Sequence, residues 1–424
     1  VASTVAVAPT WVGARRTLAC AVDCRRSLSV AALPGVGTSA HMPFLSARGV
    51  ASGSGGSDAG SSTQRPFKAW IVDSEKGKLK DRGVREFGDL SELPRQDPQA
   101  SVTVRVSHSD INYKDAMIVQ GQHGVCKGFP IVPGIDLSGV VEESHSPMWR
   151  PGDEVVLTGN KIGQFFDGGW AEFCRVQAEW LVPRPKTFSL EEGMVIGTAG
   201  FTAMQMIMHL EEFGRMTPEA GGAVLVTGAG GGVGSIAVSV LSKLGYCVVA
   251  STGRPVELED YLRGLGASEV IGRIAGDGRK QPLQAQKWAH VLDTVGGPTL
   301  STALAQTRVE GSIAAVGVAA GGILDTTVYP FVLRGVRLLG VDSTLPWNLD
   351  GYDRDVDTWQ RHRRERLSVW SRLERDLPLD SLHRTHMATV PLEEAVDWAE
   401  ELLCGRSPSA TGRVHGRVTV RVQA

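Results

Sequence analysis

The chain of 424 residues is 42% hydrophobic and 21% charged, with a formal net charge of −2. Its length exceeds what one hydrophobic core usually organises, so it predicts two domains. The nearly neutral charge is unlike that of a nucleic-acid-binding domain. The sequence also lacks a run of about 18 or more apolar residues, which a membrane-spanning helix would need. We therefore expect neither a nucleic-acid partner nor a membrane-spanning segment.

Residues 1–65 differ in composition from the rest of the chain. They contain six arginines but only two acids, Asp23 and Asp58, and they include the Gly- and Ser-rich stretch 51–62. This composition is typical of a transit peptide followed by a flexible linker, and it predicts delivery to a plastid or a mitochondrion. The alternative is a disordered tail without a targeting role, which would leave the protein in the cytoplasm.

Short β-rich runs, separated by Gly, Pro and Asp, follow from Phe67 to about residue 190. This pattern predicts an all-β or partly open barrel unit. The runs are FKAWIVD (67–73), SVTVRVSHSDI (101–111), DLSGVVEE (136–143), DEVVLTG (153–159) and AEFCRVQAEWLV (171–182).

A helical pattern begins next and continues to about Leu210. Ser189 followed by Glu192 predicts a capping box at its start. Strand, glycine turn and helix then alternate over residues 195–342, which predicts a doubly wound parallel sheet. The last part of the chain contains one predicted polar helix, 353–375, and short strands such as GRVTVRV.

The simplest architecture is therefore a β-rich unit that is interrupted by a nucleotide-type α/β unit and then resumed. We expect residues 66–194 and 343–424 to form the β-rich domain, and residues 195–342 to form the doubly wound domain. The fold class is α/β.

The run VLVTGAGGGVGS (224–235) places glycines between a strand and a helix, the context in which they indicate dinucleotide binding. Gly231 would let the backbone approach a pyrophosphate, and Gly234 would let the helix and strand pack closely. The helix N-terminus would supply N–H donors. The predicted cofactor-binding residues of this loop are Ala229, Gly230, Gly231, Gly232, Val233 and Gly234.

The next strand ends in STGR, where an NAD-specific site would carry an acid for the ribose 2′-hydroxyl. Ser251 and Arg254 instead offer a hydroxyl and a guanidinium suited to a 2′-phosphate. This favours NADPH over NADH, with Thr252 and Gly253 as further contacts. The competing interpretation is that Arg254 is an ordinary surface arginine.

Several motifs in this order resemble the medium-chain dehydrogenase/reductase superfamily, in its zinc-free quinone-oxidoreductase branch, and are most similar to the NADPH-dependent acryloyl-CoA reductases. The resemblance implies a GroES-like catalytic domain, a Rossmann domain, an active site between them and a homodimer. The motifs are INYKDAM (111–117), VPGIDLSGVV (132–141), MVIGTAGFTAM (194–204), TGAGGGVGS (227–235), STGR (251–254), LDTVGG (292–297) and PFVLRGVRLLGVDS (330–343).

The zinc-dependent members of this superfamily use Cys, His and Glu ligands, some of them near the segment that reads PGIDLSG here. A tetrahedral zinc site needs three or four converging ligands, and this sequence does not supply that set. We therefore expect no catalytic metal. Hydride transfer to an activated C=C bond needs none.

Hydride addition to the β-carbon of an α,β-unsaturated thioester builds negative charge on the carbonyl oxygen, and the α-carbon then needs a proton. The resemblance places the NYKD turn beside the nicotinamide, so it implies Asn112 and Tyr113 as candidate catalytic residues. The Tyr113 hydroxyl would donate a hydrogen bond, or the ring would only shape the nicotinamide pocket. We expect Lys114 to be a surface ion and Asp115 to be a helix cap.

The resemblance also implies further cofactor contacts. Thr202 and Phe201 would line the cleft, although core packing explains Phe201 equally well. Asp293 is expected to hold its loop through an Asx-type turn rather than to contact substrate. The remaining implied contacts are Arg273 at the adenosine end, Val318 and Val332 at the nicotinamide end, and Ser343 as a hydroxyl donor.

The substrate implied by the resemblance is a short enoyl-CoA, reduced from acryloyl-CoA to propanoyl-CoA without a metal. Arginines of WQRHRRER (359–366), with Arg334 and Arg337, would bind its phosphates, although a solvated helix face is the competing interpretation. The segments 345–353 and 404–416 look longer than in the family, which leaves the substrate entrance open.

Two other functions remain open. The protein could be an NADPH quinone or enal oxidoreductase, for which a basic patch would have no role. It could also be a non-catalytic NADPH-binding protein of the same fold, because a fold does not fix a function.

Replacing Arg254 tests the cofactor preference. Arg254→Ala is expected to raise the apparent KM for NADPH far more than the apparent KM for NADH, because only NADPH carries the 2′-phosphate. Steady-state kinetics with both nucleotides measures this. Equal increases for the two nucleotides would contradict the assignment.

Overall fold

The computed structural model describes residues 65–122, 124–274, 281–344, 356–404 and 414–423. All of them belong to one compact unit, residues 62–424. The predicted targeting segment, apart from Arg65, lies outside the described residues. So do residues 345–353 and 405–413, which make up most of the two segments that look long for the family.

The first element is a two-stranded antiparallel hairpin of β1 (Phe67–Glu75) and β2 (Lys78–Phe87). The Trp70 N–H donates to the Trp170 carbonyl at 2.9 Å, which ties β1 to the following sheet. The sequence analysis missed β2. Its side chains are exposed or only partly buried, so it lacks the apolar alternation that marks a strand.

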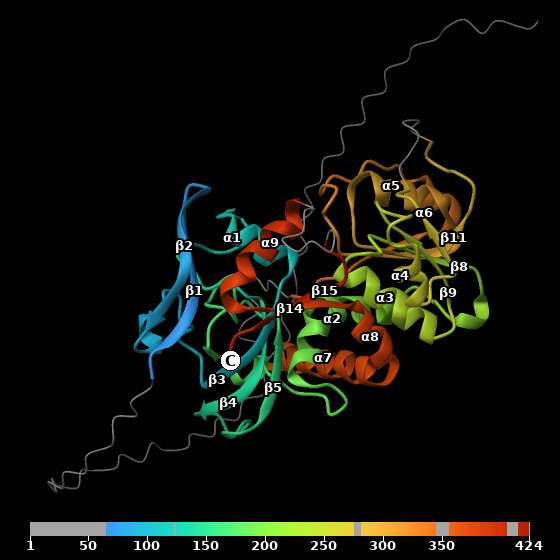
Figure 1. The fold of residues 1–424 in the computed structure, drawn as a ribbon. Coiled ribbons are helices and arrows are strands. Elements are labelled where there is room, and N and C mark those ends of the chain that lie inside the picture. The colour runs from blue at the N-terminus through green and yellow to red at the C-terminus, as the bar shows by residue number, and fades with distance from the viewer. Residues whose placement is uncertain (1–64, 123, 275–280, 345–355, 405–413, 424) are drawn as a thin grey trace, which may run out of the picture. The chain divides into compact units, whose positions relative to one another are not determined.

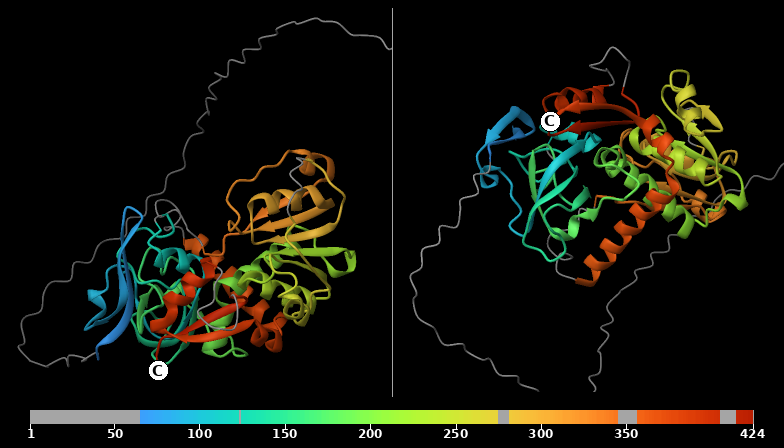
Figure 2. Two further views of the ribbon diagram at one scale, coloured as in Figure 1. Left: turned by 45° about the horizontal axis from the view of Figure 1, so that its top comes forward. Right: turned by 60° about the horizontal axis from the view of Figure 1, so that its bottom comes forward.

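A seven-stranded sheet follows, in which the C-terminal strands pair with strands from the first part of the chain (Figures 1 and 2). Its main path runs β14-β15-β3-β4-β5-β7, and β6 also pairs with β3. The strands after the parallel sheet thus join the same sheet as the strands before it. The strands are β3 (Val102–Asp110), β4 (Asp136–Ser144), β5 (Glu154–Thr158), β6 (Phe173–Val176), β7 (Val182–Pro183), β14 (His386–Pro391) and β15 (Arg417–Arg421).

The second large sheet has six strands, all parallel, in the order β10-β9-β8-β11-β12-β13. This order reverses between β8 and β11, so the predicted doubly wound Rossmann sheet is confirmed. Its strands are β8 (Ala223–Thr227), β9 (Cys247–Ser251), β10 (Glu269–Ile271), β11 (Trp288–Asp293), β12 (Thr307–Ala315) and β13 (Arg337–Gly340).

Helices cover both faces of the parallel sheet (Figure 1). Val224 and Val226 of β8 pack with α2 (Leu190–Glu212) and α3 (Gly232–Lys243), whereas Leu225 packs on the opposite face with α5 (Gly297–Gln306). Burial on both faces explains why β8 is a continuous apolar run rather than an alternating one.

The remaining helices include several short elements that the sequence did not predict. The polar helix was expected over 353–375, and α7 occupies most of that range (Figure 2). The other helices are α1 (Tyr113–Val119), α4 (Glu259–Gly264), α6 (Tyr329–Arg334), α7 (Val356–Asp376), α8 (Leu379–Thr385) and α9 (Ala395–Cys404), with 3₁₀ turns at Leu90–Glu92, Ala178–Trp180, Pro218–Ala220 and Leu392–Glu394.

Helix α2 joins the two large sheets. Its predicted capping box is confirmed, because the Ser189 side chain accepts from the Glu192 N–H and the Glu192 carboxylate accepts from the Ser189 N–H. By length and composition, α2 is the one described helix that could cross a membrane, but 89% of its apolar window is buried inside the protein, as in any core helix. The predicted domain boundary at residues 194 and 195 falls inside this helix.

Helix α2 is broken at Gly197, which has φ 50° and ψ −160°. Such a break leaves backbone groups on both sides without intrahelical partners. The Arg417 guanidinium donates to the carbonyls of Val195 at 3.0 Å and Met194 at 3.4 Å, and the Thr198 N–H donates to Asp136 at 2.6 Å. Side chains from β15 and β4 therefore cap the two halves of the helix.

Gly197 is the residue that makes this break possible. A Cβ here would lie 2.6 Å from Arg417 Nη2 and 2.9 Å from Asp136 Oδ2, and closer still to Asp110, while the positive φ disfavours other residues. We expect Gly197→Ala to lower the free energy of unfolding by about 3 kcal/mol or more, measured by urea unfolding.

Gly152 provides the control, since it has φ +94° but open space around its Cβ position. Gly152→Ala should lower the free energy of unfolding by about 1 kcal/mol, because only the strain of the positive φ contributes there. Equal losses in the two variants would contradict the packing argument at Gly197.

Candidate active site

The glycine loop leads from β8 into α3. The N-cap of α3 is Gly231, which has no side chain, and the first intrahelical bond runs from the Ser235 N–H to the Gly231 carbonyl at 2.9 Å. The N–H groups that precede this bond lack intrahelical partners and lie at the positive end of the helix dipole. This helix end therefore suits a phosphate group.

The packing of the loop agrees with the roles expected of its glycines. A Cβ on Gly234 would lie 2.6 Å from the Ala229 Cα, so this glycine allows the helix and the loop to pack closely. Gly231 is exposed, and the nearest atom to its Cβ position is the Gly228 carbonyl oxygen at 3.4 Å. The loop thus offers an open backbone surface of the kind that a pyrophosphate approaches.

The STGR turn at the end of β9 brings two arginines together. Arg254 donates to Glu257 at 2.8 Å and to the Val414 carbonyl at 2.8 Å. The Cβ position of Gly253 lies 2.8 Å from Arg273 Nε, and Arg273 is exposed. The Ser251 hydroxyl instead donates to the Gly272 carbonyl at 3.0 Å, and the Thr252 hydroxyl accepts from the Arg254 N–H at 3.3 Å.

Asn112 lies in a buried polar cluster together with Arg417 and Asp136, the two side chains that cap the break in α2. Its Nδ2 donates to Asp110 at 2.7 Å and to Asp136 at 2.9 Å, and its Oδ1 accepts from Arg417 at 3.2 Å. The amide therefore has partners on both of its polar atoms. This candidate catalytic residue is 8% exposed and holds the turn between β3 and α1.

Asp110, Asp136 and Arg417 complete this buried cluster. Arg417 and Asp110 form an ion pair, and both side chains are almost completely buried. Burial and the neighbouring Asp136 raise the pKa of Asp110, against the opposing effect of Arg417. Asp136 accepts from the Thr198 hydroxyl and N–H and from the Gly159 N–H, so every carboxylate of the cluster has donors. The sequence analysis missed this set.

Asp115 is a helix cap, as predicted. It completes a capping box with Asn112, and its Oδ1 accepts from the N–H groups of Gly134 and Ile135, both at 3.0 Å. The pKa of Asp115 is raised to about 7, mainly by burial and to a smaller extent by the nearby Asp136. The backbone N–H donors act in the opposite direction and lower it.

The prediction that Lys114 is a surface ion is wrong. The side chain is half-buried, and Nζ donates to the Thr344 hydroxyl at 2.8 Å and to Gln164 Oε1 at 3.4 Å. Thr344 follows β13, so a residue far away in the sequence covers the lysine. Tyr113, by contrast, is 45% exposed.

The hydroxyl oxygens of Thr202 and Ser343 lie 2.6 Å apart, so these two expected site residues are neighbours. Phe201 is buried, and the Arg366 guanidinium lies 4.4 Å from its ring centroid. Asp293 accepts from the Gly296 N–H at 2.8 Å, which agrees with the predicted turn. Val318 and Val332 are 64% and 67% exposed and belong to none of the hydrophobic clusters.

The predicted basic patch is largely tied to the protein. Arg366 is buried and donates to Thr158 and to the Ser343 carbonyl, and Arg363 donates to the carbonyls of Glu179 and Leu181. Arg334 donates to three backbone carbonyls, and Arg337 pairs with Glu310. These four arginines therefore fit neither of the two expected roles, whereas Arg361 and Arg364 of the same segment are exposed, as the solvated helix face predicts.

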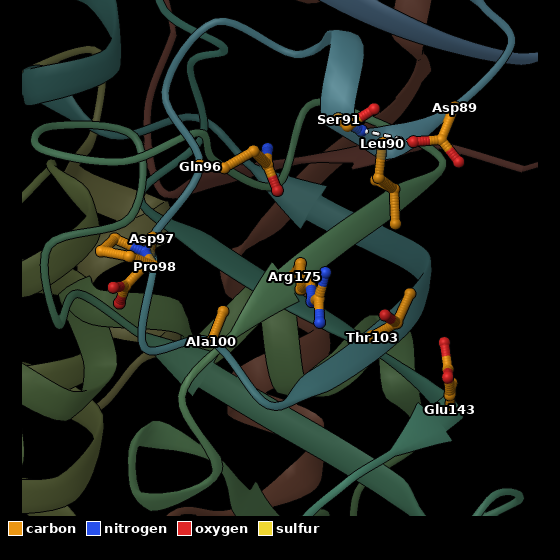
Figure 3. Close-up of a pocket in the computed structure, with 10 residues that line it drawn as sticks. All are labelled: Asp89, Leu90, Ser91, Gln96, Asp97, Pro98, Ala100, Thr103, Glu143 and Arg175. Carbon is orange, nitrogen blue, oxygen red and sulfur yellow. Dashed lines mark hydrogen bonds between the residues drawn. The ribbon is translucent and has the colours of Figure 1, made fainter. Parts of the chain in front are cut away.

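Among the described residues, no group of three or more His, Cys, Asp or Glu side chains is arranged so that it could hold a metal ion. A separate pocket of about 400 Å³ is lined by part of the segment 89–100, with Thr103, Glu143 and Arg175 (Figure 3). None of the predicted site residues lines it.

Comparison with known proteins agrees with this geometry. Residues 98–186 match the alcohol dehydrogenase GroES-like domain, and residues 232–348 match the domain described as zinc-binding dehydrogenase. The acrylyl-CoA reductase AcuI of Ruegeria pomeroyi is 40% identical over 359 residues, which cover 84% of this chain and 100% of the relative.

Solved structures are similar as well. YhdH of Escherichia coli K-12 with bound NADPH is 39% identical with a TM-score of 0.73, and YhfP of Bacillus subtilis with bound NAD is 40% identical with a TM-score of 0.72. Both comparisons cover 84% of this chain and 100% of the other. The chain therefore belongs to the medium-chain dehydrogenase/reductase superfamily, in the quinone-oxidoreductase branch that includes the acrylyl-CoA reductases.

Proposed function

We propose that this protein is an NADPH-dependent oxidoreductase that reduces the C=C bond of a short α,β-unsaturated acyl-CoA, of the acryloyl-CoA to propanoyl-CoA type. The similarity to AcuI over the whole length of that protein is the observation that carries the proposal. The open glycine loop and the exposed Arg273 beside the STGR turn support NADPH as the cofactor.

NADPH supplies a hydride when it is bound. The loop and the first N–H groups of α3 would hold its pyrophosphate, and Arg254 and Arg273 would hold its 2′-phosphate. Thr202 and Ser343 lie where the sequence after β13 meets α2, beyond the carboxyl ends of the parallel strands. Ligands of open α/β sheets bind at this edge, so these hydroxyls would face the reacting end.

The residues of the NYKD turn would have separate roles. Asn112 would fix the turn through its buried hydrogen bonds, whereas the half-exposed Tyr113 would present its hydroxyl to the substrate or the nicotinamide. Because both polar atoms of the Asn112 side chain are hydrogen-bonded to buried partners, Asn112 would act by positioning the turn.

Quinone or enal reduction is the second candidate function. The curated name of the 42% identical YhfP of Bacillus subtilis is putative quinone oxidoreductase, which favours this alternative.

We also propose a homodimer and delivery to an organelle. Seven of the fifteen exposed large hydrophobic residues of the described chain lie within residues 318–333, next to β13, which is an edge strand. Apolar patches beside an open sheet edge are typical of subunit interfaces. Organelle delivery is supported only by the composition of residues 1–65.

Paired variants separate the roles of Asn112 and Tyr113. Asn112→Ala should lower the free energy of unfolding by about 2–3 kcal/mol, because it removes the hydrogen bonds that Asn112 makes with the buried charged groups of Asp110, Asp136 and Arg417. Tyr113→Phe should change it by less than about 0.5 kcal/mol, since the ring is half-exposed, so that any loss of kcat reports on the reaction. Unchanged stability of Asn112→Ala would contradict its positioning role.

A substrate panel tests the proposed function directly. With NADPH, the full chain should reduce acryloyl-CoA with a higher kcat/KM than free acrylate esters, enals or benzoquinone, measured by loss of nucleotide absorbance. A preference for the quinone or the enals would favour the second function. NADPH binding without turnover of any of these compounds would leave the non-catalytic alternative.

A further inference from the structure

The half-buried ammonium of Lys114 lies between two neutral acceptors. Its Nζ donates to the Thr344 hydroxyl at 2.8 Å and to Gln164 Oε1 at 3.4 Å. Lys114 belongs to α1, Gln164 to the segment after β5, and Thr344 to the segment after β13. Three separate parts of the chain therefore fix the position of one cation.

Among the residues that the structure describes, neither hydrogen-bond partner of this cation is a carboxylate. Charged groups that leave water are normally paired, because an isolated buried charge is costly. The acids that act on Lys114 from further away are Asp342, Asp115 and Asp136. Burial outweighs their effect and lowers the pKa of Lys114 below its ordinary value.

These three acids already have other donors. Asp115 accepts from backbone N–H groups at the NYKD turn, and Asp136 accepts from Thr198 and Gly159. Asp342 accepts from the Thr344 N–H at 3.1 Å. In the part of the chain that the structure describes, the carboxylates are thus satisfied locally and Lys114 has no direct counter-ion.

Among the described residues, one N–H of Lys114 has no acceptor and could meet another molecule. An ammonium has three donors, and two are used by Thr344 and Gln164. The neighbouring Tyr113 is 45% exposed, and Thr344 follows Ser343, which contacts Thr202 at the edge of the parallel sheet. The ammonium therefore lies where the NYKD turn meets the ligand-binding edge of the nucleotide domain.

We propose that the Lys114 ammonium binds the carbonyl oxygen of the substrate and stabilises the negative charge that develops on it. This inference rests on the proposed function. The hydride adds its electron pair to the β-carbon, and the C=C π pair moves to form the enolate, whose oxygen accepts from Lys114. The α-carbon then takes a proton from water, and Lys114 keeps its own proton.

A purely structural role is the competing explanation, in which Lys114 only ties α1 to Thr344. Lys114→Met removes the charge and the donors, whereas Lys114→Arg keeps a cation that stays protonated throughout the accessible pH range. Lys80→Met is the matched control, because Lys80 forms an exposed ion pair with Glu75 on the β1–β2 hairpin.

Steady-state kinetics of the full chain with NADPH and acryloyl-CoA gives the first result. Lys114→Met should lower kcat about 100-fold or more with a smaller change in KM, as for the loss of an oxyanion donor. Lys80→Met should match wild type. A kcat for Lys114→Met within about threefold of wild type, with thermal unfolding unchanged, would overturn the proposal.

The pH profile separates charge from structure. Wild-type kcat should fall as the pH rises through the Lys114 pKa, because only the protonated amine carries the charge. Lys114→Arg should recover part of the rate lost in Lys114→Met and should show no fall over the same range. An identical alkaline fall in wild type and Lys114→Arg would contradict the role of Lys114.

A binding measurement keeps this test independent of the proposed reaction. Acrylate carries a permanent negative charge on its carboxylate oxygens, so it should bind to the NADP⁺-saturated wild type, and its Kd by calorimetry should rise about tenfold or more in Lys114→Met. Equal binding by both proteins, or none by wild type, would overturn the proposal. Acrylate binding without enoyl-CoA turnover would contradict the proposed function alone.

Discussion

The buried guanidinium of Arg417 is the group on which the candidate site depends. It pairs with Asp110 at the end of β3, binds the Asn112 amide before α1 and caps the first half of the broken helix α2. Burying such a charge is costly unless nearly all of its donors find acceptors, and here they do. The consequence is that one side chain from the last strand fixes the NYKD turn relative to the helix that joins the two large sheets.

The same region contains a cluster of paired charges and a cation that, among the described residues, has no carboxylate partner. Asp136 receives the Thr198 N–H at the break in α2 and the Asn112 amide, so its charge is offset within the fold. Among the described residues, Lys114 has only a hydroxyl and an amide oxygen as acceptors. The proposed role of Lys114 rests on this contrast between a paired ion and a cation without a carboxylate partner.

The sequence predicts the parts of this structure that repeat a local pattern. The glycine loop, the Ser189 capping box and the apolar strands of the parallel sheet follow from spacing within a few residues. The short elements α8, β14 and α9 were not predicted, because packing rather than a long periodic pattern stabilises them. Lys114 was misjudged for a related reason: its burial depends on Thr344, which lies 230 positions further along the chain.

The role of Arg417 was also beyond sequence reasoning. From the sequence, an arginine at the start of a β-strand is expected on the surface. Only the fold brings Arg417 to Asp110 and to the carbonyls of Met194 and Val195, which precede the break at Gly197. The resemblance to a family identified Asn112 and Tyr113 as one unit, whereas the geometry divides them into a buried positioning amide and a half-exposed ring. The sequence motifs therefore predicted where the site lies, whereas contacts between distant segments determine the role of each residue in it.

The most direct test of the account is to follow the hydride itself. Acryloyl-CoA is reduced with NADPH that carries deuterium at the transferable position, and the propanoyl product is examined by mass spectrometry and NMR. One deuterium should appear on the β-carbon, and one solvent-derived hydrogen should appear on the α-carbon. Deuterium on the α-carbon, or product formed without any label from the nucleotide, would contradict it.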